Sequence, residues 1–213
     1  MNQAQWSPKR NNINHMIVQE LSGVELWSYL RTGAHKSLCG GEHGVIESYV
    51  RNIASRAPDA KLLAVVPRTH RLRSGKFTMN YENMRGFAII NVRPDHIYVD
   101  VICGKGYGSI LFDSIFNMAH QLKKRSVELS SIALPMMRYY IRYGFRFNNR
   151  NANIMANSLV SQATRIQSNK LLSNNQKERQ LLELTDGLRV LLRKKRLGSN
   201  GNGYRMKKGP PFS

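Results

Sequence analysis

The densest group of residues that could do chemistry is the turn at residues 103–109, Cys-Gly-Lys-Gly-Tyr-Gly-Ser. An apolar, β-branched run at residues 97–103 leads into it and predicts a buried strand. Apolar residues at helical spacing follow over residues 110–122 and predict a helix. Backbone N–H groups at a helix N-terminus are unpaired, and the helix dipole there favours negative charge. Because the glycines let an anion approach the backbone and Lys105 adds a cation, the turn is predicted to hold phosphate.

Three kinds of phosphate-binding turn compete for this stretch. A Walker-type loop has a longer glycine spacing that ends in Gly-Lys-Ser/Thr, which is absent here. A dinucleotide-binding turn needs Gly-x-Gly-x-x-Gly and an acid about 20 residues further on. The spacing here is Gly-x-Gly-x-Gly, although Glu128 lies near the required distance. The third kind, a coenzyme A pyrophosphate turn, accounts for more of the residues.

Residues 104–109 and the helix after them resemble the coenzyme A pyrophosphate loop of the GNAT superfamily of acyl-CoA N-acyltransferases. Residues 137–145, Met-Arg-Tyr-Tyr-Ile-Arg-Tyr-Gly-Phe, resemble that family's other recurrent segment, a helix with Phe/Tyr-Tyr that ends in Gly-Phe. A strand-like run at residues 126–131 separates them, so the two segments come in the family's order. The resemblance covers about residues 60–149. It implies an α/β fold with a mixed, mostly antiparallel sheet flanked by helices.

The resemblance also implies a reaction, the transfer of an acetyl or similar acyl group from acetyl-CoA or another acyl-CoA to an unidentified amine. Tyr140 matches the family's tyrosine that protonates the coenzyme thiolate, and a phenol can donate a proton to a thiolate. The alternative for Tyr140 is a packing role, with Tyr139 and Tyr143, on the apolar face of a helix. The residues that would hold the coenzyme are Gly104, Lys105, Gly106, Tyr107, Gly108 and Ser109.

A base is needed to take the proton of the amine, and Asp100 on the strand before the turn is the candidate. Strict alternation would place it on one side of the sheet with Tyr98 and Ile102. Asp95 and His96 stand at the start of the same strand. Two alternatives stay open, because Asp100 could be a paired structural carboxylate and water could take the proton.

The chain departs from the family pattern at two points. Cys103 stands where the loop usually begins with Arg or Gln, and the strand runs directly into the glycines without a Pro-containing link. The first change removes a cation from the phosphate site and the second shortens the cleft. Such shortened loops resemble those of acetyltransferase-like proteins of large DNA viruses. A non-catalytic relative that kept the fold is therefore an alternative.

Charge supports the same alternative. The 213 residues carry a net charge of +20. Residues 1–149 hold 20 Lys/Arg against 10 Asp/Glu, and residues 150–213 hold 13 against 3. Such an excess predicts contact with a polyanion, and the basic helix near the C-terminus is the expected contact surface. The alternative function is thus a nucleic-acid-binding or structural protein, for example a virion component.

Cysteine count and hydropathy bear on location. Two cysteines, Cys39 and Cys103, could pair but form no disulfide framework, so a reducing compartment is expected. The sequence has no run of about 18 apolar residues and begins with a polar stretch, so we expect a soluble intracellular protein in cytoplasm, nucleus or virion. His35, Cys39 and His43 have a spacing that could suggest metal ligands. Because Gly40 and Gly41 break any helix there, no metal is expected.

The chain is expected to divide into a loose arm at residues 1–12, a GNAT-like domain at 13–149 and a basic helical extension with a flexible tail at 150–213. Composition allows one core of ordinary size plus an appendage. The further elements expected are helices at residues 18–32 and 45–57, strands at 61–66 and 86–92, and a basic amphipathic helix at 176–197 that is broken or bent near Asp186-Gly187. Residues 198–213 are not expected to fold alone.

Overall fold

A computed structural model gives the structure of the chain, and it forms two compact units. The first comprises Met1–Val127 with Pro210–Ser213, and the second comprises Glu128–Gly209. The domain boundary expected between residues 149 and 150 falls inside the second unit. The residues described are 15–22, 38, 60–68, 84–104, 106–131, 134–194 and 204–212.

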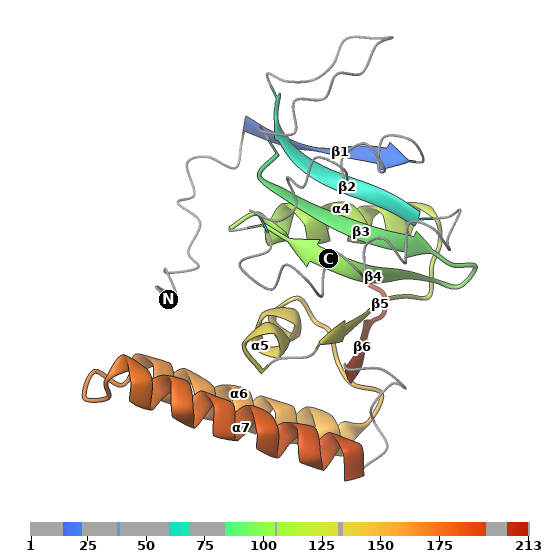
Figure 1. The fold of residues 1–213 in the computed structure, drawn as a ribbon. Helices are drawn as coiled ribbons and strands as arrows, with labels where there is room; N and C mark the ends of the chain where they lie inside the picture. The colour runs from blue at the N-terminus through green and yellow to red at the C-terminus, as the bar shows by residue number, and fades with distance from the viewer. Residues whose placement is uncertain are drawn as a thin grey trace. The chain divides into compact units, whose positions relative to one another are not determined.

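The first unit is built on an antiparallel sheet whose four strands follow one another in chain order (Figure 1). The register places Leu21 opposite Leu62, and Leu62 opposite Ile89, so one apolar face continues across the sheet. Its strands are β1 (Met16–Ser22), β2 (Ala60–Pro67), β3 (Gly86–Val92) and β4 (His96–Cys103). Residues 93–95 connect β3 to β4 as a short turn, which an antiparallel pair of strands allows.

The two central strands, β2 and β3, are buried along almost their whole length. Side chains alternate between the faces of a strand, so such continuous burial means that both faces are covered. One covering element is α4 (Gly108–Gln121), which packs against the sheet (Figure 1). Its buried residues include Phe112 and Phe116, whose rings stack with centroids 5.6 Å apart. Phe212 stacks on Phe116 in turn, at 6.2 Å.

The first strand corrects a prediction. The helix expected from residue 18 is wrong over residues 18–22, where the chain forms β1. Ile17 and Leu21 are spaced for helix or strand alike, but they pack on the apolar cluster of β2 and β3 through period-2 spacing. Pairing with β2 makes this segment a strand and not a helix, since strand preference depends on cross-strand neighbours. The rest of that predicted helix, and the one at residues 45–57, lie outside the described residues.

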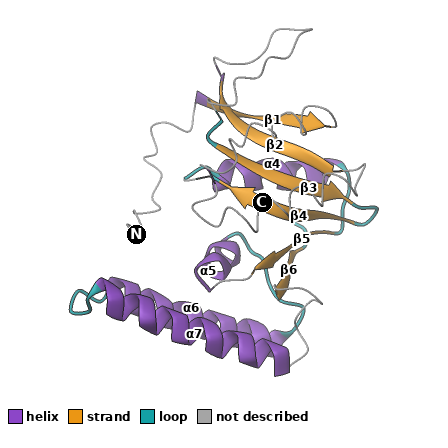
Figure 2. Ribbon diagram, in the orientation of Figure 1, coloured by secondary structure: helices purple, strands orange, loops and turns teal. Residues whose placement is uncertain are grey.

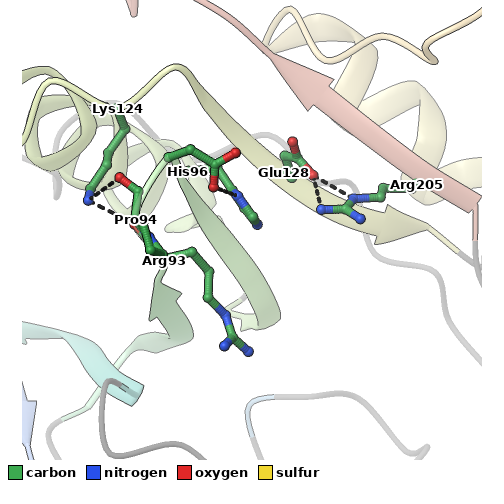
Figure 3. Close-up of polar contacts among 7 residues, drawn as sticks. Arg93, Pro94, His96, Lys124, Glu128 and Arg205 are labelled. Carbon is green, nitrogen blue, oxygen red and sulfur yellow. Dashed lines mark hydrogen bonds and ion pairs between the residues drawn. The ribbon is translucent and has the colours of Figure 1, made fainter.

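The turn between β3 and β4 is held by residues that follow α4. Lys124 Nζ donates to the carbonyl oxygens of Arg93, at 2.8 Å, and Pro94, at 3.2 Å (Figure 3). The Arg125 amide donates to the Asp95 carbonyl at 2.8 Å. One cation of the basic run at residues 123–125 is therefore engaged with the protein's own backbone.

The second unit combines helices with two short strands (Figure 2). The helices α6 and α7 form a hairpin, and α5 packs against α6. Met206 in the last strand is 1% exposed, and the strand's Lys207 exchanges two backbone hydrogen bonds of 2.8 Å with Arg146. Arg205 pairs with Glu128 (Figure 3). The elements are β5 (Ser126–Ser131), which begins just before the unit, α5 (Leu134–Arg142), α6 (Arg150–Ser168), α7 (Asn174–Lys194) and β6 (Tyr204–Lys208).

The C-terminal part differs from its prediction in two ways. No separate helix was predicted at residues 150–168, where α6 forms, and the Asn149 side chain caps this helix by accepting a hydrogen bond from the Ala152 amide at 3.0 Å. Of the break or bend expected near Asp186-Gly187, the break is wrong, since α7 spans both residues. Residues 204–208, in the stretch not expected to fold alone, form β6, which neighbours β5 and bridges to Arg146, so that expectation is not contradicted.

The predicted fold class is confirmed in its main terms, a mixed α/β chain with a mostly antiparallel sheet and flanking helices. Predicted strands at residues 86–92 and 126–131 match β3 and β5. Within the described parts of the chain, none of the helices has the length and apolar character needed to cross a bilayer.

Candidate functional site

The glycine turn and the start of α4 lie where the sequence predicted them. Gly106 has φ of +83°, in the region that favours glycine, and α4 begins at Gly108 after Tyr107. In this described segment no side chain caps the helix at Tyr107, and the first turn of α4 contains no acidic residue. The first N–H groups of α4 are thus left for another acceptor. Lys105, the predicted cation of the turn, lies outside the described residues.

Gly104 is required by packing of the backbone. A Cβ atom on Gly104 would lie 2.7 Å from the Gly86 Cα and 3.2 Å from the Arg85 carbonyl oxygen. Its φ of +148° is also one that other residues rarely adopt. Gly104 therefore closes the end of β4 onto the start of β3, which explains this glycine without a ligand.

Asp100 lies on a β-bulge. Ile89 of β3 is opposite Val101, whereas the next residue, Ile90, is opposite Val99, so the ladder skips Asp100. A bulge leaves one residue unpaired and changes the direction of its side chain. The expected placement of Asp100 on one face with both Tyr98 and Ile102 is wrong, because the bulge puts Tyr98, opposite Asn91, and Ile102, opposite Ala88, on different faces of the sheet.

The half-buried carboxylate of Asp100 accepts a hydrogen bond from Asn91 Nδ2 on the neighbouring strand. Asn91 is 4% exposed and stands opposite Tyr98 in the ladder. Its other side-chain atom, Oδ1, is buried and has no hydrogen-bond partner in the part of the chain that the structure describes. The bulge and the amide together hold a carboxylate beside an unsatisfied acceptor.

The remaining acids of the predicted site are engaged elsewhere. Asp95 Oδ1 lies 2.6 Å from His96 Nδ1, and this side-chain hydrogen bond lowers the pKa of Asp95, with Arg125 adding a smaller effect of the same sign. Glu128, the acid that a dinucleotide site would need, pairs with Arg205. That ion pair gives Glu128 a structural role and removes support for the dinucleotide alternative.

Cys103 stands directly before Gly104, the first glycine of the turn, and is disulfide-bonded. Cys39, the other cysteine of the sequence, lies outside the described residues, as do His35 and His43. The expectation of reduced cysteines is thus not met at Cys103, because a count of cysteines does not reveal which sulfur atoms the fold brings together.

Tyr140 lies on α5 in the second unit and is 7% exposed. Its ring contacts Tyr139 and Phe145 edge-on, with centroids 5.9 Å and 6.1 Å away. Burial raises the pKa of Tyr140 to about 12, because a phenolate would lose its hydration. Tyr140 is therefore protonated at neutral pH. Its ring also contributes to packing, which was the alternative role considered for this residue.

The structure thus joins two parts of the predicted site along one strand. Asp100 and the start of the turn at Gly104 are both in the first unit, four residues apart on β4 and its end. The uncapped start of α4 fits a phosphate group, since its N–H groups and dipole both suit an anion. Asn91 and Gly86 were missed in the sequence. The only signals were a polar residue near the end of an apolar strand and a glycine at its start.

No protein-family model and no curated protein matches this chain. Several solved acetyltransferase structures are similar to it. A Streptococcus agalactiae acetyltransferase is 10% identical over 92% of this chain and 99% of its own, with a TM-score of 0.46. Arabidopsis thaliana NAA60 in complex with acetyl-CoA is 16% identical over 63% of this chain and 86% of its own, with a TM-score of 0.41.

A GNAT-family acetyltransferase from Staphylococcus aureus is 12% identical over 63% of this chain and 88% of its own, with a TM-score of 0.40. Its family is the one that residues 104–109 and 137–145 resemble. At such identities and TM-scores the likeness is one of fold alone and says nothing about the reaction.

Proposed function

We propose that this chain is an N-acyltransferase that moves an acetyl or similar acyl group from an acyl-CoA to an amine. One observation carries the proposal: β4 holds the Asp100 carboxylate on a bulge four residues before a glycine turn and an uncapped helix start. A carboxylate that can accept a proton and a site suited to phosphate are the two parts that acyl transfer from a coenzyme A thioester needs.

The phosphate-binding part of the proposal rests on the turn. The amides of Gly108 and Ser109 at the start of α4 would donate to the pyrophosphate, and Gly106 permits the backbone to approach it. Lys105, although outside the described residues, would add a positive charge by its place in the sequence. The resemblance of residues 104–109 to a coenzyme A pyrophosphate loop supports the same assignment.

The bound coenzyme would supply an acyl group activated as a thioester. Asp100, or water, takes a proton from the amine, which makes its nitrogen a nucleophile. A bond then forms between this nitrogen and the acyl carbon while the bond from carbon to sulfur breaks. Tyr140 is proposed as the donor that protonates the departing thiolate, on its match to the family pattern.

The raised pKa of Tyr140 bears on that role in two ways. It keeps the phenol protonated at neutral pH, which a donor needs. It also makes release of the proton costly, because a free thiol has a pKa of about 8.5, well below that of Tyr140. Because the phenol is the proposed source of the proton for the thiolate, we expect Tyr140→Phe to lower kcat with little change in coenzyme affinity. Equal kcat in this variant and the wild type would remove Tyr140 from the mechanism.

Calorimetric titration of acetyl-CoA into the protein tests the coenzyme site. In Ser109→Glu a negative charge enters the first turn of α4, where it stabilises the helix but repels a pyrophosphate. Asn117→Glu adds the same charge to an exposed position further along the helix. We expect Ser109→Glu to bind acetyl-CoA at least tenfold more weakly than Asn117→Glu, with no loss of thermal stability.

The outcome separates binding from folding. Weak binding by Ser109→Glu together with an unchanged melting temperature supports a phosphate site at the start of α4. If the wild-type protein shows no heat of binding at millimolar acetyl-CoA, or if both variants bind equally, the proposed function is wrong.

A further inference from the structure

Asn91 presents a buried polar atom that the fold leaves unsatisfied. The residue is 4% exposed, its Nδ2 donates to Asp100, and its Oδ1 has no hydrogen-bond partner within the described chain. Leaving a buried acceptor unpaired costs about 1–3 kcal/mol. Folded proteins contain few such atoms, and those they keep call for an explanation.

The orientation of the amide follows from its neighbour. If the Asn91 side chain were turned over, its Oδ1 would face the Asp100 carboxylate, and two acceptors would meet. While Asp100 is ionised, Nδ2 must therefore point at the carboxylate and Oδ1 must point away from it. Asp100 thus fixes which atom of Asn91 is left without a donor.

The two groups come from neighbouring strands and meet at the bulge. Asn91 on β3 stands opposite Tyr98, and the side chain of Asp100, the residue that the ladder skips, reaches it. The result is one anionic and one neutral acceptor held side by side. A primary ammonium group, with three N–H donors, no acceptor and one positive charge, complements such a pair.

We propose that Asn91 and Asp100 together bind the acceptor amine, with Asn91 Oδ1 accepting an N–H of the ammonium group and the Asp100 carboxylate neutralising its charge. This inference rests on the proposed function and names the residue that would select its substrate. A primary ammonium group can satisfy both acceptors, whereas a quaternary ammonium group has charge but no N–H, and a hydroxyl group brings one donor and no charge.

The side-chain amide of Asn91 provides a direct test by NMR of ¹⁵N-labelled protein. The probe is methylammonium chloride, and tetramethylammonium chloride at equal ionic strength is the matched control, with the same charge and no N–H. The absence of its signals in Asn91→Leu assigns the Asn91 resonances. We expect methylammonium to shift them in a saturable manner and tetramethylammonium to leave them in place. Equal shifts with both salts, or none, would overturn the inference.

Two variants separate ligand binding from folding. Because Asn91→Leu lacks the Asn91 side-chain signal, binding to both variants is followed at the backbone amide of Val101, next to Asp100. Asn91→Leu removes the unpaired acceptor at similar volume, and Asp100→Asn removes the charge at the same size. Each is expected to weaken methylammonium binding at least tenfold, and Asn91→Leu also loses the hydrogen bond to Asp100, so its melting temperature does not decide the question. A folded Asn91→Leu that binds methylammonium as the wild type does would show that Asn91 is purely structural. If Asn91→Leu does not fold, the inference is tested by comparing Asp100→Asn with the wild type and methylammonium with tetramethylammonium.

Acetyl-CoA affinity keeps this inference distinct from the proposed function. Both variants should bind acetyl-CoA as the wild type does, because the phosphate site lies on the turn and not at Asn91. If the wild-type protein binds acetyl-CoA but shows no shift with methylammonium, the amine site alone is wrong. If it binds no acetyl-CoA, the proposed function is wrong, whether or not methylammonium binds.

Discussion

The Cα atom of Gly86 lies 2.7 Å from the position that a Cβ atom on Gly104 would occupy. The start of β3 and the end of β4 therefore touch through their backbones. In the opposite direction, a Cβ on Gly86 would lie 3.0 Å from the Cys103 carbonyl oxygen. This contact fixes where β4 ends and hence where the glycine turn begins.

Gly104→Ala should therefore destabilise the protein strongly. The methyl group meets backbone that cannot rotate away, and φ of +148° adds strain for any residue with a Cβ. We expect a loss of about 2–5 kcal/mol in the free energy of unfolding, measured by chemical denaturation. Gly187→Ala in α7 is the control, since no atom lies within 4 Å of the place that its added methyl group would take. It should gain about 0.5–1 kcal/mol. Similar effects of both changes would contradict the packing argument.

Lys123 follows the C-terminal end of α4 and has a left-handed conformation, with φ of 51°. The Lys124 amide bonds to the Ala119 carbonyl at 2.8 Å and the Lys123 amide to the His120 carbonyl at 3.0 Å, which is a Schellman motif. Glycine is preferred at this position. We expect Lys123→Gly to raise the free energy of unfolding by up to about 1 kcal/mol. Lys123→Ala, which loses the same side chain but keeps the Cβ, should show no gain, and an equal gain in both would exclude the conformational cause.

Asn153 ties α6 to the segment that follows α5. Its Oδ1 accepts from the Phe147 amide at 2.7 Å and its Nδ2 donates to the Phe147 carbonyl at 2.8 Å. Because Phe147 is 4% exposed, Asn153→Ala leaves two shielded backbone groups without partners. We expect a loss of about 2–4 kcal/mol in thermal or chemical unfolding. Asn151→Ala, an exposed asparagine in the same helical turn, should change stability by less than about 0.5 kcal/mol.

The sequence predicted the parts that depend on local pattern. The glycine turn, the helix after it and the strands at residues 86–92 and 126–131 were found where composition and periodicity placed them. The helix expected from residue 18 was wrong, since Ile17 and Leu21 fit either period and a partner strand decided the outcome. The helix α6 was missed because its asparagine-rich start looks like a turn, although asparagine also caps helices.

The candidate site was predictable only in part. Asp100 was chosen because it is a carboxylate on the strand before the turn, which needs no knowledge of pairing. The contribution of Asn91 depends on the cross-strand register and on its hydrogen bond to Asp100 at the bulge. A one-residue irregularity of this kind leaves no mark in the sequence of either strand. The coenzyme-binding and proton-donor roles stay predictions.

The raised pKa of Tyr140 predicts how stability depends on alkaline pH. In the unfolded chain a tyrosine titrates near pH 10, whereas in the folded protein burial raises the pKa of Tyr140 to about 12. The folded state therefore holds this proton more tightly. The stabilising effect of Tyr140 is fully present below pH 10 and is lost as the pH rises from 10 to 12.

Phenylalanine at position 140 cannot ionise, so Tyr140→Phe should lose less stability over this range. The difference from the wild type should be on the order of 1 kcal/mol per pH unit, measured by urea denaturation at pH 9, 10 and 11. Tyr139→Phe, which removes a hydroxyl from the neighbouring and more exposed ring, serves as the matched control. If Tyr140→Phe and the wild type lose stability in parallel above pH 10, the Tyr140 hydroxyl is in contact with water. Burial would then no longer explain a phenol that stays protonated.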